Sequence, residues 1–152
     1  MQVTERTAGS QAIGALLVAL VGVGLVVYGL WFIIQNFKTL IEIGLSPDEV
    51  GKTGEQIRTF SPGVYNYISH VQVALGGFIA ATGVAIAFMA WYGVRRGESW
   101  AWWGVVITTV AWVAIATPFH YVYGFGTLAH LGPTYFALAF VAIGGYLTRP
   151  WR

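Results

Sequence analysis

The stretch AIGALLVALVGVGLVVYGLWFII, residues 12–34, decides the fold, because it carries no charged residue along its whole length. A helix needs about 20 consecutive, mostly apolar residues to cross a bilayer. The run lacks the alternation of apolar and polar residues that marks a transmembrane strand. It also exceeds the roughly 7–15 apolar residues of a secretory signal peptide. We therefore expect a first transmembrane helix that stays in the protein.

Three further stretches have the length and apolar character of transmembrane helices: residues 67–92, 100–117 and 128–148. The whole chain is 57% hydrophobic and only 9% charged, with a mean hydropathy of +0.67. A soluble domain carries roughly 25% charged residues, so these charges are too few to cover a water-facing surface. The sequence predicts an all-α, polytopic membrane protein, with residues 1–152 forming one four-helix transmembrane bundle.

The segment 37–66, between the first two predicted spans, is the most polar part of the chain. Ser46-Pro47-Asp48-Glu49 has the pattern of a helix start, with Ser46 as N-cap and Glu49 closing a capping box. Ser61-Pro62 is a second start, at the beginning of the second span. We expect this segment to form a short helical cap on the membrane surface.

Basic residues near the spans predict the orientation in the membrane, because cytoplasmic loops carry an excess of Lys and Arg. No Lys or Arg lies between the third and fourth spans. This distribution places both termini in the cytoplasm, in a cell (inner) membrane, and the cap on the outer side. The basic residues that flank the spans on the predicted inner side are Arg6, Arg95, Arg96, Arg149 and Arg152.

The three histidines of the chain, His70, His120 and His130, all fall on the predicted outer side. At a rise of about 1.5 Å per residue they lie about 33, 30 and 27 Å from the inner boundary, one level within roughly 6 Å. His70 shares a helix face with the small residues Ala74, Gly77 and Ala81. Small residues let transmembrane helices approach closely, so this face should pack inward and bring His70 into the bundle.

Three interpretations of the histidines stay open. They can bind haem, copper or zinc through neutral imidazole, with Glu42 as a further metal ligand. They can instead line a pocket for a quinone, a lipid headgroup or another polar ligand, or simply donate hydrogen bonds to loop carbonyls. In the first two cases, Tyr67, Tyr121 and Tyr123 are the candidate supporting residues, since hydrogen-bond partners orient imidazole ligands.

Several chemistries are excluded or disfavoured by what the sequence lacks. It has no cysteine, which excludes disulfides, thiolate-bound metals and cysteine nucleophiles. No predicted span has a charged residue at mid-depth, which argues against an ion-coupled transporter. No phosphate loop, H-E-x-x-H or G-x-S-x-G motif is present. The small positive charge is a signal of membrane topology, and we expect no nucleic-acid partner.

The hairpin Arg95-Arg96-Gly97-Glu98-Ser99-Trp100-Ala101-Trp102-Trp103 resembles the central hairpin of several prokaryotic four-helix membrane families, DoxX-like proteins among them. The resemblance covers about the second and third spans. DoxX-like proteins include parts of quinone-linked sulfur oxidation systems. No functional residue outside the hairpin matches, so the resemblance assigns no role to any site residue.

Three functions follow as hypotheses. The first is a non-catalytic subunit or accessory protein that contacts other membrane proteins, or a second copy of itself, through small-residue faces. The second is a haem- or metal-binding redox protein that uses the three histidines. The third is a lipid- or quinone-handling protein, with or without enzymatic activity, whose histidines line an outer pocket.

Overall fold

The computed structural model describes residues 2–151, with side chains from residue 8 onward, and its regular structure is entirely helical there. The four long helices are α1 (Gln2–Thr39), α4 (Pro62–Phe88), α5 (Ser99–Val122) and α6 (Leu128–Leu147). Each is long and apolar enough to cross a membrane. The predicted all-α fold with four spanning helices is confirmed, and the chain is a small multi-pass membrane protein.

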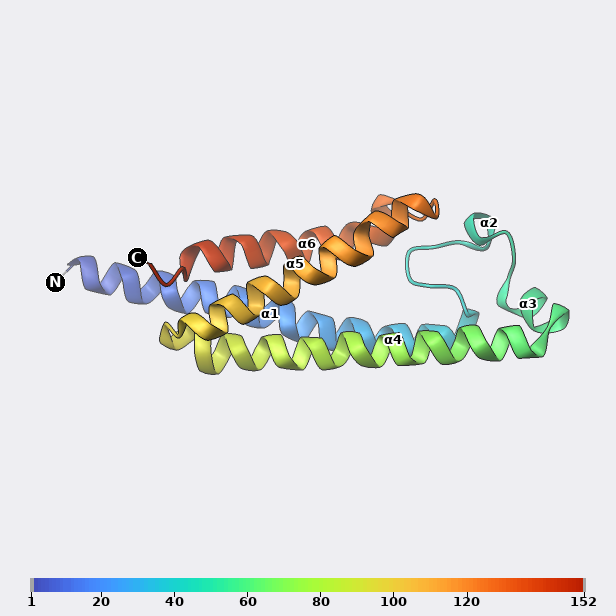
Figure 1. The fold of residues 1–152 in the computed structure, drawn as a ribbon, viewed down its shortest axis with the longest axis horizontal. Coiled ribbons are helices and arrows are strands. Elements are labelled where there is room, and N and C mark those ends of the chain that lie inside the picture. Colours follow the sequence, from blue (N-terminus) through green and yellow to red (C-terminus); the bar gives the residue numbers. More distant parts are fainter. Residues whose placement is uncertain (1, 152) are drawn as a thin grey trace.

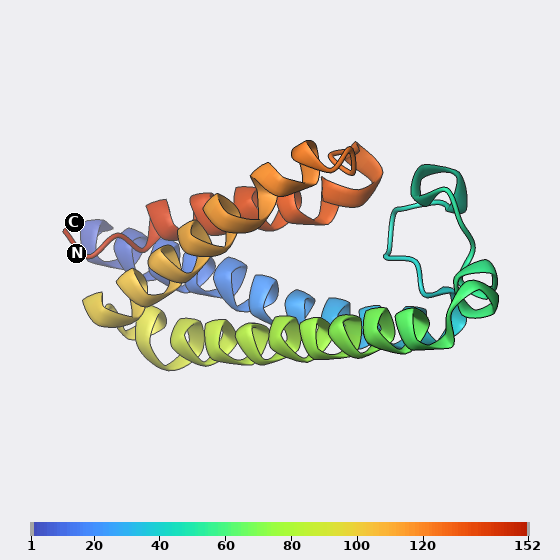
Figure 2. The same cartoon turned by 45° about the vertical axis from the view of Figure 1, so that its right-hand side comes forward.

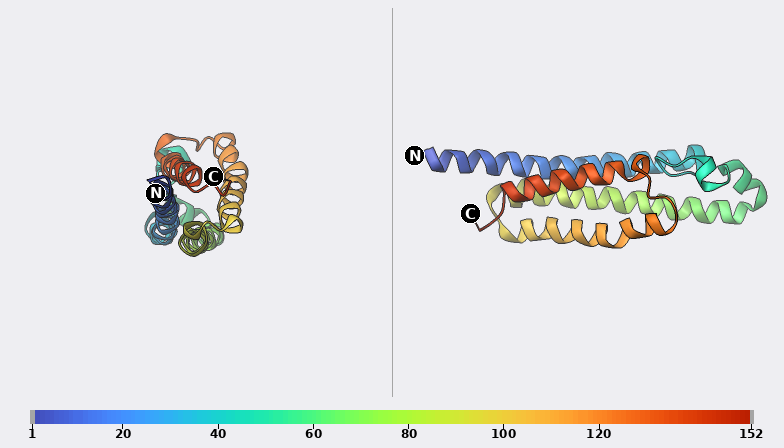
Figure 3. Two further views of the ribbon diagram at one scale, coloured as in Figure 1. Left: turned by 90° about the vertical axis from the view of Figure 1, so that its left-hand side faces the viewer. Right: turned by 90° about the horizontal axis from the view of Figure 1, so that it is seen from above.

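The long helices form a ring in the order α1, α4, α5, α6, each antiparallel to the next along the chain (Figure 3). Gln2 and Trp151 lie near one end of the bundle, here called the proximal end (Figure 1). The opposite end, here called the distal end, holds the segment between α1 and α4 and the loop between α5 and α6. That the proximal end faces the cytoplasm stays a prediction.

Two pairs of glycines bring α1 and α4 into close contact. A Cβ atom on Gly83 would lie 2.5 Å from the carbonyl oxygen of Gly22, and one on Gly29 would lie 2.5 Å from the carbonyl oxygen of Gly76. The glycines are seven residues apart on each helix, so both pairs fall on one contact stripe. Close backbone approach of this kind drives helix association in lipid, where no hydrophobic effect is available.

The predicted packing stripe of α4 was wrong. Ala74, Gly77 and Ala81 are exposed, and a Cβ on Gly77 would meet nothing within 4 Å. The face that packs on α1 is the neighbouring one, which holds Gly76 and Gly83. The physical reason is that backbone contact on both helices requires glycines opposite glycines, and only that face supplies them.

At the proximal end the chain turns from α4 into α5 through a π-helical turn, η1 (Met89–Gly93), and a 3-10 turn, η2 (Val94–Arg96). Gly97, with φ 78°, completes the predicted tight hairpin. The indole nitrogen of Trp102 donates to the carbonyl oxygen of Gly145 at 2.9 Å and ties α5 to α6. From this anchored end, α5 diverges from α4 toward the distal end (Figures 1 and 2).

The cap contains two short helices, α2 (Pro47–Val50) and α3 (Gly54–Phe60). The predicted capping box is confirmed: the Ser46 side chain accepts from the backbone of Glu49, and the Glu49 carboxylate accepts from the backbone of Ser46. Ser61 caps α4, also as predicted. A second capping box, between Thr53 and Gln56, starts α3 and was not expected.

The capping box should affect the titration of Glu49. Hydrogen bonds from the side chain and backbone of Ser46 hold the pKa of Glu49 below its usual value. A lowered folded-state pKa means that the contact stabilises the cap above the unfolded pKa and is lost as the pH falls through the folded pKa. We expect Ser46→Ala to raise the pKa of Glu49 toward that of free glutamate, measured by carbon NMR of its carboxyl. An unchanged titration would contradict this role for Ser46.

Candidate functional site

The segment that follows α1 folds back over the distal end of the bundle; we call residues 40–45 the strap. It begins at Leu40, a buried non-glycine residue in the left-handed region, with φ 60°. The Leu40 carbonyl oxygen accepts from the buried side chain of Gln72 at 3.1 Å, which fastens the strap to α4. Gly44, with φ 82°, then passes so close to α6 that a Cβ there would lie 2.6 Å from the carbonyl oxygen of Ala129.

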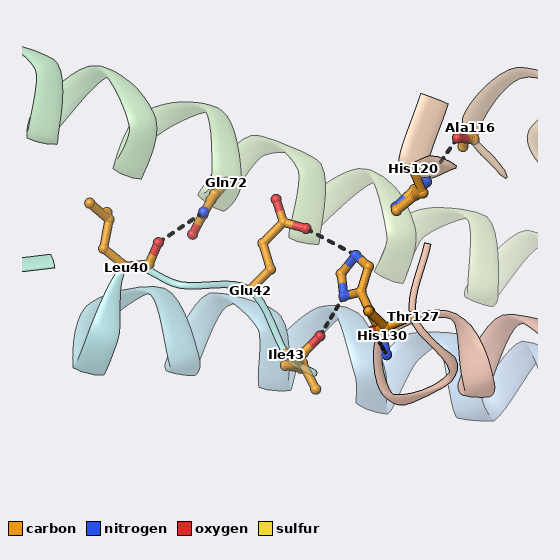
Figure 4. A network of polar contacts seen from close by, with 8 residues as sticks. All are labelled: Leu40, Glu42, Ile43, Gln72, Ala116, His120, Thr127 and His130. Carbon is orange, nitrogen blue, oxygen red and sulfur yellow. Dashed lines mark hydrogen bonds and ion pairs between the residues drawn. The ribbon is translucent and has the colours of Figure 1, made fainter. Parts of the chain in front are cut away.

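His130, in the first turn of α6, holds the strap in place. The side chain is buried, with 6% of the residue exposed. Its Nδ1 atom lies 2.7 Å from the carbonyl oxygen of Ile43, and its Nε2 atom lies 3.6 Å from Oε2 of Glu42 (Figure 4). A carbonyl oxygen can only accept, so Nδ1 of His130 carries a proton. Nε2 therefore faces the Glu42 carboxyl at ion-pair distance.

His120, in the last turn of α5, completes this group. Its ring centroid lies 5.0 Å from that of His130, on the side away from Glu42 (Figure 4). Its Nδ1 atom lies 2.8 Å from the carbonyl oxygen of Ala116, one turn earlier in α5. By the same argument Nδ1 is the protonated nitrogen of His120, and Nε2 of the neutral ring is an acceptor. We call Glu42, His120 and His130 the polar end.

The polar end lies on a cavity of about 490 Å³ between the four long helices. Pockets for small organic ligands are mostly apolar and measure about 300–1,000 Å³. This cavity fits that description, because the rest of its wall is dominated by aliphatic and aromatic side chains. The wall includes Gly24 and Tyr28 of α1, Phe78 and Ile79 of α4, Trp112 and Thr117 of α5, and Ala137 and Val141 of α6.

The cavity lining is exposed on α4 and α5, and we infer a sideways opening between these two helices. Three of its lining residues there are exposed: Phe78 is 71% exposed, Leu75 42% and Trp112 38%. The cause is the divergence of α5, which packs on the hairpin and on α6 but makes at most marginal contact with α4. In a bilayer, this opening faces the acyl chains of the lipids.

Comparison with known proteins gives no family for this chain. No family model matches it, and no curated protein or solved structure matches it either. The resemblance of residues 95–103 to DoxX-like proteins therefore stays a prediction. The cavity and the polar end are the features of the structure that bear on its function.

The three predicted site histidines do not come together. His120 and His130 do, but His70 is exposed on the outward face of α4 and does not line the cavity. Its predicted inward orientation followed from the packing stripe that proved wrong. Within residues 8–151, no three His, Asp or Glu side chains are placed to hold a metal ion, so the structure does not gather His70, His120, His130 and Glu42 into one cluster.

The three predicted supporting tyrosines lie outside the cavity. Tyr67, Tyr121 and Tyr123 are exposed, and none of them lines it. The hydroxyl of Tyr121 shares a hydrogen bond with that of Tyr135, which joins α5 to α6 at the distal end. The cavity tyrosine is Tyr28, in the distal half of α1. Nothing in the sequence of α1 alone distinguishes it from an aromatic residue facing lipid.

Proposed function

We propose that this membrane protein binds a bilayer-soluble molecule that combines an apolar chain with a small ring carrying hydrogen-bonding oxygens. This is the chemistry of an isoprenoid quinone. The single observation that carries the proposal is the cavity of about 490 Å³, which is apolar along its length and ends at His120, His130 and Glu42. The polar end supplies hydrogen-bonding groups to the ring, and the apolar wall contacts the chain.

The dimensions support such a ligand. Along α6 the cavity extends from His130 to Val141, which is about 17 Å at a rise of about 1.5 Å per residue. A ring at the polar end therefore leaves room for part of an apolar chain. The opening between α4 and α5 lets the remaining chain extend into the bilayer.

The charge at the polar end favours a neutral ring over a phospholipid headgroup. Glu42 contributes a carboxyl, and no Lys or Arg is among the described residues that line the cavity. A phosphate placed there would meet the Glu42 carboxyl in an apolar setting without a Lys or Arg to pair with it, which is unfavourable. A quinone ring carries no such charge.

A glycine in the cavity wall allows a direct test. Gly24 lines the cavity, and a Cβ there would meet nothing within 4 Å, so Gly24→Phe fills the cavity without a backbone clash. We expect this variant to weaken the binding of a decyl-substituted benzoquinone at least tenfold, because the ligand then competes with the phenylalanine side chain for the volume of the cavity. Binding is measured as saturable quenching of tryptophan fluorescence, since Trp112 lines the same cavity.

The matched control is Gly77→Phe, at a helical glycine that also has open space but lies outside the cavity. It should bind the quinone as the unchanged protein does. Two outcomes contradict the proposal: no saturable binding to the unchanged protein, or equal affinities for the two variants.

A second candidate is assembly with other subunits or with a second copy, through the outward face of α4. Ala74, Gly77 and Ala81 form a small-residue stripe that no part of the described chain covers. The chain has no cysteine, so Gly77→Cys introduces a single thiol. Rapid disulfide formation between copies in liposomes would support self-association through this face, and a thiol that stays reduced under oxidant would contradict it.

A further inference from the structure

The polar end contains more hydrogen-bond acceptors than free donors. Nδ1 of His130 donates to Ile43, and Nδ1 of His120 donates to Ala116. These bonds leave Nε2 of each neutral ring with a lone pair, and the Glu42 carboxylate adds acceptor oxygens. The side-chain amide of Gln72 donates one of its two N–H groups to Leu40, and Gln72 does not line the cavity.

The hydroxyl groups in the same part of the cavity wall do not remove this excess of acceptors over donors. Tyr28, Thr117 and Thr134 line the cavity, and a hydroxyl can either donate or accept. They therefore serve a carbonyl and a hydroxyl of the ligand equally well. The discrimination rests on Nε2 of His120, whose Nδ1 is the donor to Ala116, and on the Glu42 carboxylate, which both accept hydrogen bonds.

From this balance we infer that the polar end selects the reduced, hydroxyl-bearing form of its ligand, a quinol, over the carbonyl-bearing quinone. The inference rests on the proposed function and names the ligand class of that same cavity. The O–H groups of a quinol donate to Nε2 of His120 and to the Glu42 carboxylate. A quinone has only carbonyl oxygens, which face those same acceptors without a proton between them.

The apolar wall strengthens the selection. An acceptor that loses its water on ligand binding and gains no donor is penalised, and a site arranged for a hydroxyl discriminates strongly against an analogue that lacks it. Nε2 of His130 faces the Glu42 carboxylate at 3.6 Å, so the selection does not depend on this atom.

The test compares three probes that share one decyl chain: a hydroquinone, the corresponding benzoquinone and the dimethyl ether of the hydroquinone. Affinities are measured in nanodiscs under argon at pH 8. We expect the hydroquinone to bind at least tenfold more tightly than either other probe. The dimethyl ether separates loss of the O–H donors from any effect of redox state.

Two variants of His120 locate the selectivity. His120→Phe keeps a ring but removes the acceptor, and should reduce the preference for the hydroquinone to less than threefold. His120→Gln keeps an acceptor oxygen and should retain most of it. Thermal unfolding of both variants checks that the bundle is intact, and the comparison of probes on the unchanged protein does not depend on either variant.

The outcomes separate this inference from the proposed function. Equal affinities for the three probes, or tighter binding of the benzoquinone, would overturn the selection of the quinol while leaving the cavity a binding site. A preference that persists unchanged in His120→Phe would overturn the role of His120. If none of the probes binds saturably, the proposed function fails together with the inference.

Discussion

Replacing Gly83 by leucine should lower the free energy of unfolding by about 3 kcal/mol or more, the upper range for overpacking a close contact. A Cβ at this position would lie 2.5 Å from the carbonyl oxygen of Gly22 and 2.7 Å from the backbone nitrogen of Val26. Neither backbone atom can move without separating α1 from α4. We expect a large fall in melting temperature and loss of the monodisperse peak on gel filtration in mild detergent.

The control for this prediction is Gly77→Leu on the same helix. It adds the same side chain where a Cβ has no neighbour within 4 Å. Its melting temperature should stay within a few degrees of that of the unchanged protein. If Gly83→Leu and Gly77→Leu are equally stable, the glycine contacts do not hold α1 and α4 together.

Gly44→Ala should detach the strap from α6. Alanine there has to adopt φ 82°, which costs about 1–2 kcal/mol, and its Cβ would lie 2.6 Å from the carbonyl oxygen of Ala129. Release of the strap removes the Ile43 carbonyl and the Glu42 carboxyl from His130 together. Hydrogen exchange of residues 40–45, followed by mass spectrometry, should accelerate at least tenfold.

Gly51→Ala is the control for this prediction. It distinguishes the cost of the left-handed backbone conformation from the steric clash with α6. Gly51 has nearly the same backbone angle, φ 79°, but open space around the position of a Cβ. It therefore carries the conformational cost without the contact with α6. Exchange in the strap should be unchanged in Gly51→Ala. If hydrogen exchange in the strap accelerates equally in Gly44→Ala and Gly51→Ala, close packing against Ala129 does not hold the strap on α6.

The spanning helices could be predicted because apolar length and helix-capping residues are local properties of the chain. The loop between α5 and α6 covers residues 123–127, because α5 continues to Val122, five residues past the predicted end of the third span. The packing face of α4 is not a local property. Gly76 and Gly77 are adjacent and therefore point about 100° apart, and the choice between them depends on α1. The seven-residue spacing shared by Gly22 and Gly29 with Gly76 and Gly83 was the signal that could have decided it.

The candidate site could be predicted only in part. Depth along the helices correctly indicated that His120 and His130 lie at one end of the bundle, because rise per residue fixes depth. His70 was misplaced because rotation about the helix axis, unlike depth, depends on the partner helix. The contact between Glu42 and His130 depends on the left-handed conformations of Leu40 and Gly44. Of these two residues, only glycine favours that conformation, so the sequence could indicate only one of the two turns.

The side opening between α4 and α5 determines whether the ligand concentration in the membrane or in water governs how fully the cavity is occupied. A cavity that communicates with the acyl chains equilibrates with molecules dissolved in the membrane, not with those in water. The relevant quantity is then the mole fraction of ligand among the lipids. For the proposed ligand, we expect that adding ligand-free lipid to proteoliposomes dilutes the ligand and empties the cavity, whereas adding buffer has almost no effect. Occupancy in a living membrane would therefore follow lipid composition, and the protein would respond to the size of the membrane's ligand pool.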